Sequence, residues 1–365
     1  MTYARARLWL GISNVGTLVT LSVAALLTGL PYRLAADSGG EFSLVALFLV
    51  GIAVLSLPFD WLGGVVLPRR FDRPAPTTGA WMMRWLRGAL IHTSVLLAIG
   101  GALLVAGRAF GFAGALVAFL LSSLVLVAFQ KGIARFVARL PETPDPLLPS
   151  VAWVDTDDAA FTGGIAGLPG QHRVLLPSRW REVLPEDVIV AMVHRRRLAA
   201  ISGARTAGIL VALGWNAAGF VLASLVTGAA VSTAAGLIML SLGFTLWSFV
   251  GLLVLPSLGR RSVFALDQLA LRAGISHDAL RCAIRRLDTL QDDEPQRGRW
   301  IETIFHPIPS VDERVRRLDE CRPTFGAWHA ARLALYTSWA GLGLLGRAVH
   351  CNVGRPSQWV YLPAD

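Results

Sequence analysis

Six long apolar segments constrain the fold of this chain more than any other feature of its sequence. Each is long enough to cross the hydrocarbon core of a bilayer, which takes about 20 residues of helix. They run over Leu8–Leu30, Phe42–Leu67, Ala89–Gly107, Phe112–Phe129, Thr206–Ala230 and Thr233–Leu255. Hydrophobic residues make up 54% of the 365 residues and charged residues only 16%, and the mean hydropathy is +0.55. This composition predicts a mainly α membrane protein with about six transmembrane helices.

The positive charges alternate between successive loops. The formal net charge is +10. Basic residues gather before the first segment, between Pro68 and Gly88, after Phe129 and after Leu255, whereas the other loops hold one arginine or none. The positive-inside rule therefore predicts that both terminal regions and both polar stretches lie in the cytoplasm. We expect an integral protein of the plasma membrane, or of the bacterial inner membrane.

Charge and cysteine patterns also restrict the partners. The arginines flank apolar segments and are not interleaved with stacking aromatic residues, so we expect no nucleic acid. The lipid bilayer, through its head groups, is the expected counter-charge. The three cysteines, Cys282, Cys321 and Cys351, lie far apart in the sequence. Their spacing predicts no disulfide framework and no cysteine metal site.

Two polar stretches are separated by an apolar hairpin. We expect an N-terminal membrane domain with four spans over residues 1–139, a soluble domain in two parts over 140–203 and 257–328, and a transmembrane hairpin over 204–256. Neither soluble part is large enough for a good core, so the two parts are expected to close together. The tail over 329–365 is expected to be amphipathic or membrane-associated. Its apolar part, Ala330–Val349, could form a seventh span, but its two arginines favour an interfacial helix.

The polar stretch before residue 203 contains an amphipathic helix with an unusual run, His194-Arg195-Arg196-Arg197-Leu198. Its register resembles the catalytic helix of the integral-membrane zinc peptidases, the family of the CAAX prenyl protease and the heat-shock membrane protease. That family carries H-E-x-x-H, in which two histidines bind zinc and the glutamate is the general base. Here the general-base position is Arg195 and the second ligand position is Leu198. Leucine has no lone pair to offer, and arginine stays protonated in proteins.

Further blocks are similar to the same family in the same order. In Ser262–Asp267, Val263 stands at the position of the third zinc ligand. Asp267 stands where the family has an acidic residue that supports a ligand histidine; we expect it to pack between helices or to pair with an arginine. His306-Pro307 and Arg314 are similar to the family's Thr-His-Pro and closing arginine.

A strand pair is also similar to this family. Val154-Asp155, Ala159–Gly164 and Val174–Ser178 look like the family's strand pair, in which an Asn-Ala-Phe turn precedes an edge strand that holds extended substrate. The family's Asn-Ala-Phe turn has Ala159 in place of its asparagine. The resemblance as a whole implies a cytoplasmic, zincin-like α+β domain.

We interpret the chain as a catalytically inactive pseudoprotease without zinc or another cofactor. Its degenerate site would comprise His194, Arg195, Leu198, Val263, Asp267 and His306. Its role would be to bind, regulate or scaffold another membrane protein or a peptide. One alternative is an active zinc metalloendopeptidase with rearranged ligands, drawn from His172, Asp267 and His306 around His194. A second alternative is a transporter or lipid-handling protein that reuses the membrane bundle.

Overall fold

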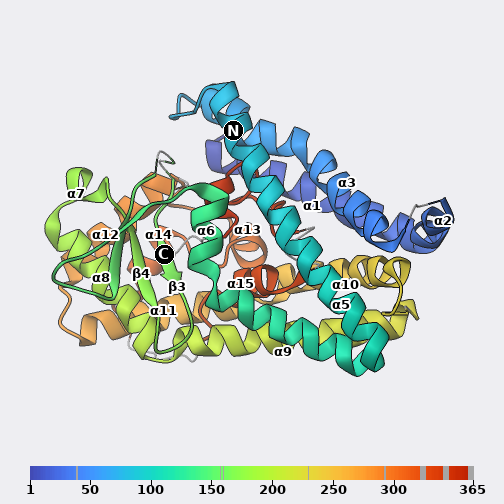
Figure 1. The fold of residues 1–365 in the computed structure, drawn as a ribbon. Helices are drawn as coiled ribbons and strands as arrows, with labels where there is room; N and C mark the ends of the chain where they lie inside the picture. The colour runs from blue at the N-terminus through green and yellow to red at the C-terminus, as the bar shows by residue number, and fades with distance from the viewer. Residues whose placement is uncertain are drawn as a thin grey trace.

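Long helices at one end and a small sheet with shorter helices at the other make up the molecule (Figure 1). The computed structural model describes residues 1–37, 40–156, 158, 160–228, 230–291, 293–320, 326–339 and 345–360. Ala159 and Cys321, both named above, lie outside the described residues.

The long helices follow the apolar segments of the sequence. They are α1 (Tyr3–Thr28), α3 (Glu41–Trp61), α5 (Thr78–Ala128), α9 (Ala204–Thr227) and α10 (Ala234–Val254). Shorter pieces adjoin them: α2 (Leu30–Asp37), the π-turn η1 (Leu62–Val66), α4 (Leu67–Arg70) and α11 (Pro256–Arg272). Within the described residues, five helices are long and apolar enough to cross a membrane. The chain is therefore an integral membrane protein by length and composition.

Helix α5 contains two of the apolar segments predicted from the sequence. It runs for 51 residues, but Gly111 has φ 62° and ψ −151°, which is not helical. In Figure 1 the chain turns back near the far end of α5 and returns toward α6 (Gln130–Ala138). Only glycine adopts this backbone conformation at little cost, because a Cβ would clash with the neighbouring peptide groups. Gly111 therefore divides α5 into two helical segments.

Four short strands form one sheet in the order β1-β2-β4-β3. They are β1 (Glu142–Pro144), β2 (Val151–Val154), β3 (Gly164–Ala166) and β4 (Arg173–Pro177). β2 and β4 are parallel, whereas β1 and β3 run antiparallel to their neighbours, so β3 is an edge strand. The remaining helices of this part are α7 (Trp180–Val183), α8 (Glu186–Ile201), α12 (His277–Gln291), α13 (Arg299–Phe305) and α14 (Val311–Arg317).

One hydrophobic core joins the two polar stretches of the sequence. Trp180 and Met192 from the first stretch pack with Leu266, Ala283 and Leu287 from the second. All five side chains are buried, so each stretch supplies apolar surface that the other needs. The two stretches thus fold together across the hairpin of α9 and α10.

The C-terminal segment, residues 326–339 and 345–360, is largely buried in the interior of the molecule. Its helix α15 (Ala330–Thr337) has only eight residues, and the 3₁₀ turn η2 (Pro356–Gln358) follows later. Tyr336 Oη donates a hydrogen bond to the carbonyl of Leu126 (2.8 Å), and Trp339 Nε1 donates to that of Leu96 (2.6 Å). The described residues therefore do not form the interfacial helix expected from the sequence. The segment is buried because the bundle supplies partners for its polar groups.

Candidate functional site

Helix α8 positions the arginine run that the sequence singled out. Glu186 and Asp187 occupy its first turn, where negative charge stabilises the positive end of the helix dipole. Val188 and Met192 bury its apolar side against the core. A helix turns by about 100° per residue, so this packing fixes which of the following side chains point inward.

The inward-facing positions of α8 are Arg195, Arg196 and Ala199, all buried. Their spacing is i, i+1 and i+4, the same as in H-E-x-x-H, but shifted by one residue from the frame expected from the sequence. His194 is exposed, and Leu198 is half-buried against the core. The structure thus leaves His194 on the outside of α8, whereas Leu198 packs against core clusters that include Leu266 and Ala270 of α11.

Arg195, Asp267 and Arg314 form a buried ion cluster. Arg195 Nε donates to Asp267 Oδ1 at 2.6 Å. Arg314, from α14, donates through Nε to Asp267 Oδ2 at 2.9 Å and through Nη2 to Oδ1 at 2.8 Å. All three side chains are at most 4% exposed. Arg195 Nη2 also donates to the backbone carbonyl of Val263 at 3.3 Å, so Arg195 contacts both family-related positions of α11.

The donor chemistry of this cluster does not fit zinc. Both carboxylate oxygens of Asp267 already accept hydrogen bonds from guanidinium groups. Val263 contributes only an apolar side chain, and arginine has no lone pair for a metal. Two guanidinium groups beside the carboxylate would also repel a divalent cation. Among the described residues, no group of three or more His, Cys, Asp or Glu side chains could hold a metal ion.

Arg196 and Arg205 bind the backbone of the sheet. Arg196 donates to the carbonyls of Leu175 (3.0 Å) and Thr162 (2.6 Å), at the place where β3 begins beside β4. Arg205, at the start of α9, donates to the carbonyls of Ile165 and Gly167, both at 2.8 Å. Arg196 of α8 and Arg205 of α9 therefore connect these helices to the edge of the sheet through hydrogen bonds.

The outer edge of β3 is the side that Arg205 contacts. Val174 donates its N–H to Ser150, beside β2, so Val174 faces away from β3. Ile165 is the antiparallel partner of Val174. In such a pair without mutual hydrogen bonds, both backbone groups of Ile165 point away from β4. A strand added to this edge would need the carbonyl that Arg205 already uses.

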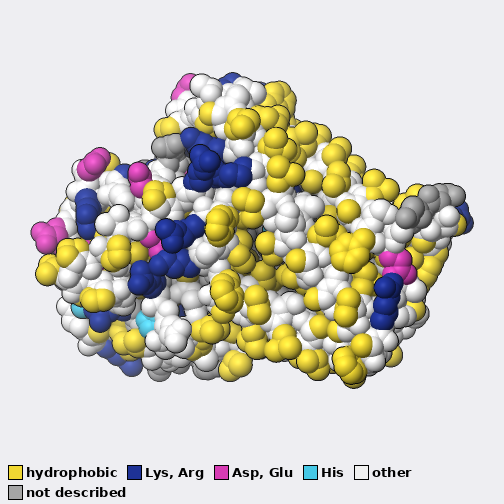
Figure 2. All heavy atoms as spheres, viewed as in Figure 1, with side chains coloured by type: hydrophobic (Ala, Val, Ile, Leu, Met, Phe, Trp, Pro, Cys, Tyr) yellow, Lys and Arg dark blue, Asp and Glu magenta, His cyan; other side chains and the backbone are white. Residues whose placement is uncertain are grey.

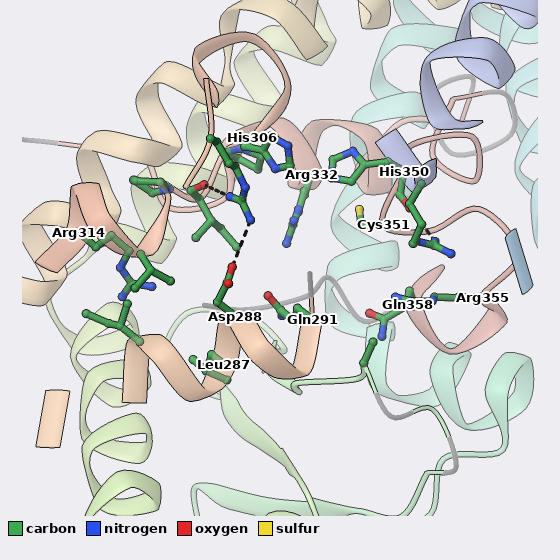
Figure 3. A pocket seen from close by; sticks show the side chains of 18 residues that line it. Leu287, Asp288, Gln291, His306, Arg314, Arg332, His350, Cys351, Arg355 and Gln358 are labelled. Carbon is green, nitrogen blue, oxygen red and sulfur yellow. Dashed lines mark hydrogen bonds and ion pairs between the residues drawn. The ribbon is translucent and has the colours of Figure 1, made fainter. Parts of the chain in front are cut away.

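His306 lines a small basic cavity (Figure 3) that His194 does not line. The ring of His306 is 5.0 Å from that of His350, and in Figure 3 both flank Arg332 above α12. The cavity has a volume of about 50 Å³, and Arg314 of the ion cluster also lines it. This space holds a few water molecules but no peptide. The C-terminal residues His350, Cys351, Arg355 and Gln358 form one of its walls.

His172, a candidate ligand in the rival interpretation, is half-buried in the loop before β4. Burial lowers the pKa of His172, and Arg205 and Arg197 lower it further. The charged groups that act on His172 are therefore arginines, and their positive charge disfavours binding of a metal cation by this histidine.

Sequence reasoning missed the roles of Arg196 and Arg205. The signal that was available is the scarcity of acidic residues: the chain has 34 Lys and Arg against 24 Asp and Glu. Buried arginines in such a chain must bind backbone carbonyls as well as carboxylates, because unsatisfied buried donors are costly. Neither arginine lies near its carbonyl partners in the sequence, so the pairing required the fold.

Comparison with known proteins identifies the class of fold. No protein-family model matches the sequence. No curated protein matches it either. The structure is similar to the crystal structure of S. mikatae Ste24p, with a TM-score of 0.64 and 13% sequence identity, over 76% of this chain and 75% of that chain. This likeness supports, at the level of the fold, the family that the motifs resemble. The chain is thus a membrane protein with a Ste24p-like fold.

Proposed function

We propose that this chain is a catalytically inactive member of the membrane metallopeptidase class, which binds, regulates or scaffolds another membrane protein. One observation carries the proposal: Arg195, Asp267 and Arg314 form a buried ion cluster at the positions that resemble a zinc site. A general base must accept a proton from water. Its position is Arg195 in the register expected from the sequence and Arg196 in the buried register of α8, and no arginine can accept this proton. The protein would use no metal or other cofactor.

The edge of the sheet supports a non-catalytic role as well. A peptidase of this class would hold an extended substrate by adding it to an edge strand. In this chain Arg205 occupies the carbonyls of Ile165 and Gly167 on that edge. Partners would therefore bind elsewhere on the molecule, and the exposed apolar side chains of the long helices suit contact with the lipid.

The charge pattern supports an orientation. Arg84 and Arg87 near the start of α5 and Arg139 at the end of α6 border the same cavity as residues of the sheet part. The arginine-rich ends of the helices thus lie on the same side as the sheet. By the positive-inside rule, this side would be the cytoplasm, with the protein in a plasma or bacterial inner membrane.

A cleavage assay tests the proposal. The full chain in lipid nanodiscs would be incubated with unfolded casein and with membrane-inserted peptide reporters, with added zinc or with a chelator. A working membrane metallopeptidase of the same fold is the positive control. We expect no difference between zinc and chelator. Cleavage that the chelator abolishes, and that Asp267→Ala also abolishes without loss of folding, would refute the proposal and favour an enzyme with rearranged ligands.

A further inference from the structure

A cavity of about 840 Å³ lies between the ends of the membrane helices and the sheet part. It is bordered by the first turns of α5, the end of α6, the loop after β2, the end of α12 and the C-terminal segment. Cavities of several hundred Å³ suit small-molecule ligands. This cavity is separate from the ion cluster of Arg195, none of whose residues line it.

The lining of this cavity is strongly basic. Five arginines line it against two aspartates; the arginines are Arg73, Arg84, Arg87, Arg139 and Arg355, and the aspartates are Asp155 and Asp158. Asp158 already accepts hydrogen bonds from Ser357 Oγ (2.6 Å) and from the N–H of Ala160 (3.1 Å). The excess of positive charge around one space favours an anionic ligand.

Two of these arginines have donors to offer. Arg87 donates through Nη2 to the carbonyl of Val137 (3.3 Å), while its buried Nε has no hydrogen-bond partner among the described residues. Arg139 is exposed and ends α6 in the left-handed conformation, with φ 49°. Glycine is the residue that best suits this helix-end position. An arginine at this position carries backbone strain. We infer that a role of its side chain in the cavity offsets this strain.

An apolar surface adjoins the arginines. Met83 and Trp81 line the cavity on α5, and Val137 lines it on α6. Next to them on the outside, Leu90 is 60% exposed and Phe136 is 70% exposed. Figure 2 shows Lys and Arg side chains gathered over the end of α6 and the adjacent part of α5, beside hydrophobic surface. The basic cavity suits an anionic head group, and the apolar surface beside it suits the hydrocarbon chains of the same lipid.

We propose that this cavity binds the phosphate head group of an anionic phospholipid from the leaflet on the side of the sheet. Arg87 and Arg139 would bind the phosphate oxygens, because guanidinium groups match phosphate geometry with paired hydrogen bonds. The acyl chains would lie against Met83 and the apolar outer surface of α5. Basic pockets between membrane helices on the cytoplasmic side have the chemistry that recognises such lipids.

Thermal unfolding of the full chain in detergent tests this proposal, because a ligand that binds only the folded state raises the Tm. Phosphatidylglycerol, phosphatidylcholine and inorganic phosphate would be titrated separately. We expect phosphatidylglycerol alone to raise the Tm. An equal rise with phosphatidylcholine would overturn the proposal, since only the acyl chains would then matter. An equal rise with inorganic phosphate would overturn it too, because the site would bind phosphate without a lipid.

Variants locate the effect in the cavity. Replacing both Arg87→Gln and Arg139→Gln should raise the half-saturating phosphatidylglycerol concentration at least about tenfold, because two charged hydrogen-bonding groups are lost. The matched control is the double variant Arg69→Gln with Arg70→Gln, which removes the same two charges from exposed arginines that do not line the cavity. A variant of Arg87 and Arg139 that responds like the control would contradict the proposal.

A single variant separates binding from folding. Arg139→Gly places the favoured residue at the left-handed end of α6, so the Tm without lipid should stay equal or rise. The rise of Tm caused by phosphatidylglycerol should nevertheless shrink. An undiminished lipid effect in Arg139→Gly would refute the assignment of Arg139 to the head group.

Discussion

Asp267 is the residue on which the degenerate site depends. Its carboxylate is buried and accepts hydrogen bonds from Arg195 and Arg314, so it compensates their guanidinium charge. Removing one partner of a buried ion pair is far more costly than removing a surface pair, because the remaining charge stays buried. The cluster therefore links α8, α11 and α14.

Substituting Asp267 should destabilise the fold strongly. For Asp267→Ala we expect a loss of about 3–5 kcal/mol in the free energy of unfolding, measured by denaturant titration in detergent micelles. His194→Ala, on the exposed side of α8, is the control and should change this free energy by less than about 0.5 kcal/mol. Similar effects of the two variants would show that the cluster does not stabilise the protein.

At this scale the sequence predicted the loss of the general base but not the new partners. The run from His194 to Leu198 resembles H-E-x-x-H with arginine and leucine in place of the glutamate and the second histidine. The partner of Arg195 lies 72 residues away, and Arg314 lies a further 47 residues beyond Asp267. Which arginine faces inward depends on the rotation of α8, and tertiary packing of its apolar side sets that rotation.

Among the elements, α5 shows how one backbone position shapes the membrane part. Two apolar segments were predicted from the sequence, and Gly111 divides the helix between them. Its φ of 62° with ψ −151° is accessible to glycine and strained for other residues. The reversal of the chain at this place therefore depends on a single glycine.

Gly111→Ala should weaken the hairpin within α5. We expect a loss of about 1–3 kcal/mol in the free energy of unfolding, the cost of a strained backbone position. Gly16→Ala in α1 is the control, because Gly16 is helical and nothing lies within 4 Å of an added Cβ. That control should be neutral or stabilising by about 0.5–1 kcal/mol. If the two variants have the same free energy of unfolding, a side chain at position 111 does not strain the backbone.

Helices and strands differed in how well the sequence predicted them. Long apolar runs specify membrane helices because the bilayer leaves no other way to satisfy the backbone. The edge strand β3 has only three residues, and its identity depends on pairing with β4 and on Arg205. Such a short strand has no periodic signal of its own.

At the scale of the whole molecule, the C-terminal segment links the membrane helices to the sheet part. Asp60 of α3 is fully buried and accepts hydrogen bonds from Arg347 Nη2 (2.7 Å), the N–H of Gly354 (2.7 Å) and Trp85 Nε1 (2.8 Å). The sequence showed an arginine in an apolar tail, which favoured a surface helix. Its carboxylate partner lies 287 residues earlier, so local pattern could not predict that the tail is buried.

Asp60→Asn should release this segment. Because Arg347 would stay buried beside a neutral group, we expect a loss of about 3–5 kcal/mol in the free energy of unfolding. Limited proteolysis should also cut the C-terminal segment faster in the variant. Asp72→Asn is the control, because Asp72 is exposed and lies in the turn after α4, only 12 residues beyond Asp60. An unchanged proteolysis rate in Asp60→Asn would show that Asp60 does not anchor the segment.

The zinc content of the purified protein tests the central claim most directly. The full chain would be purified in detergent without chelator and without metal-affinity resin, and zinc per chain would be measured by mass spectrometry of the elements. Since the donors around Asp267 do not suit zinc, we expect less than about a tenth of an equivalent, unchanged in His194→Ala. A full equivalent of zinc that is lost in His194→Ala or in Asp267→Asn would contradict the account and show that a metal site persists in this fold.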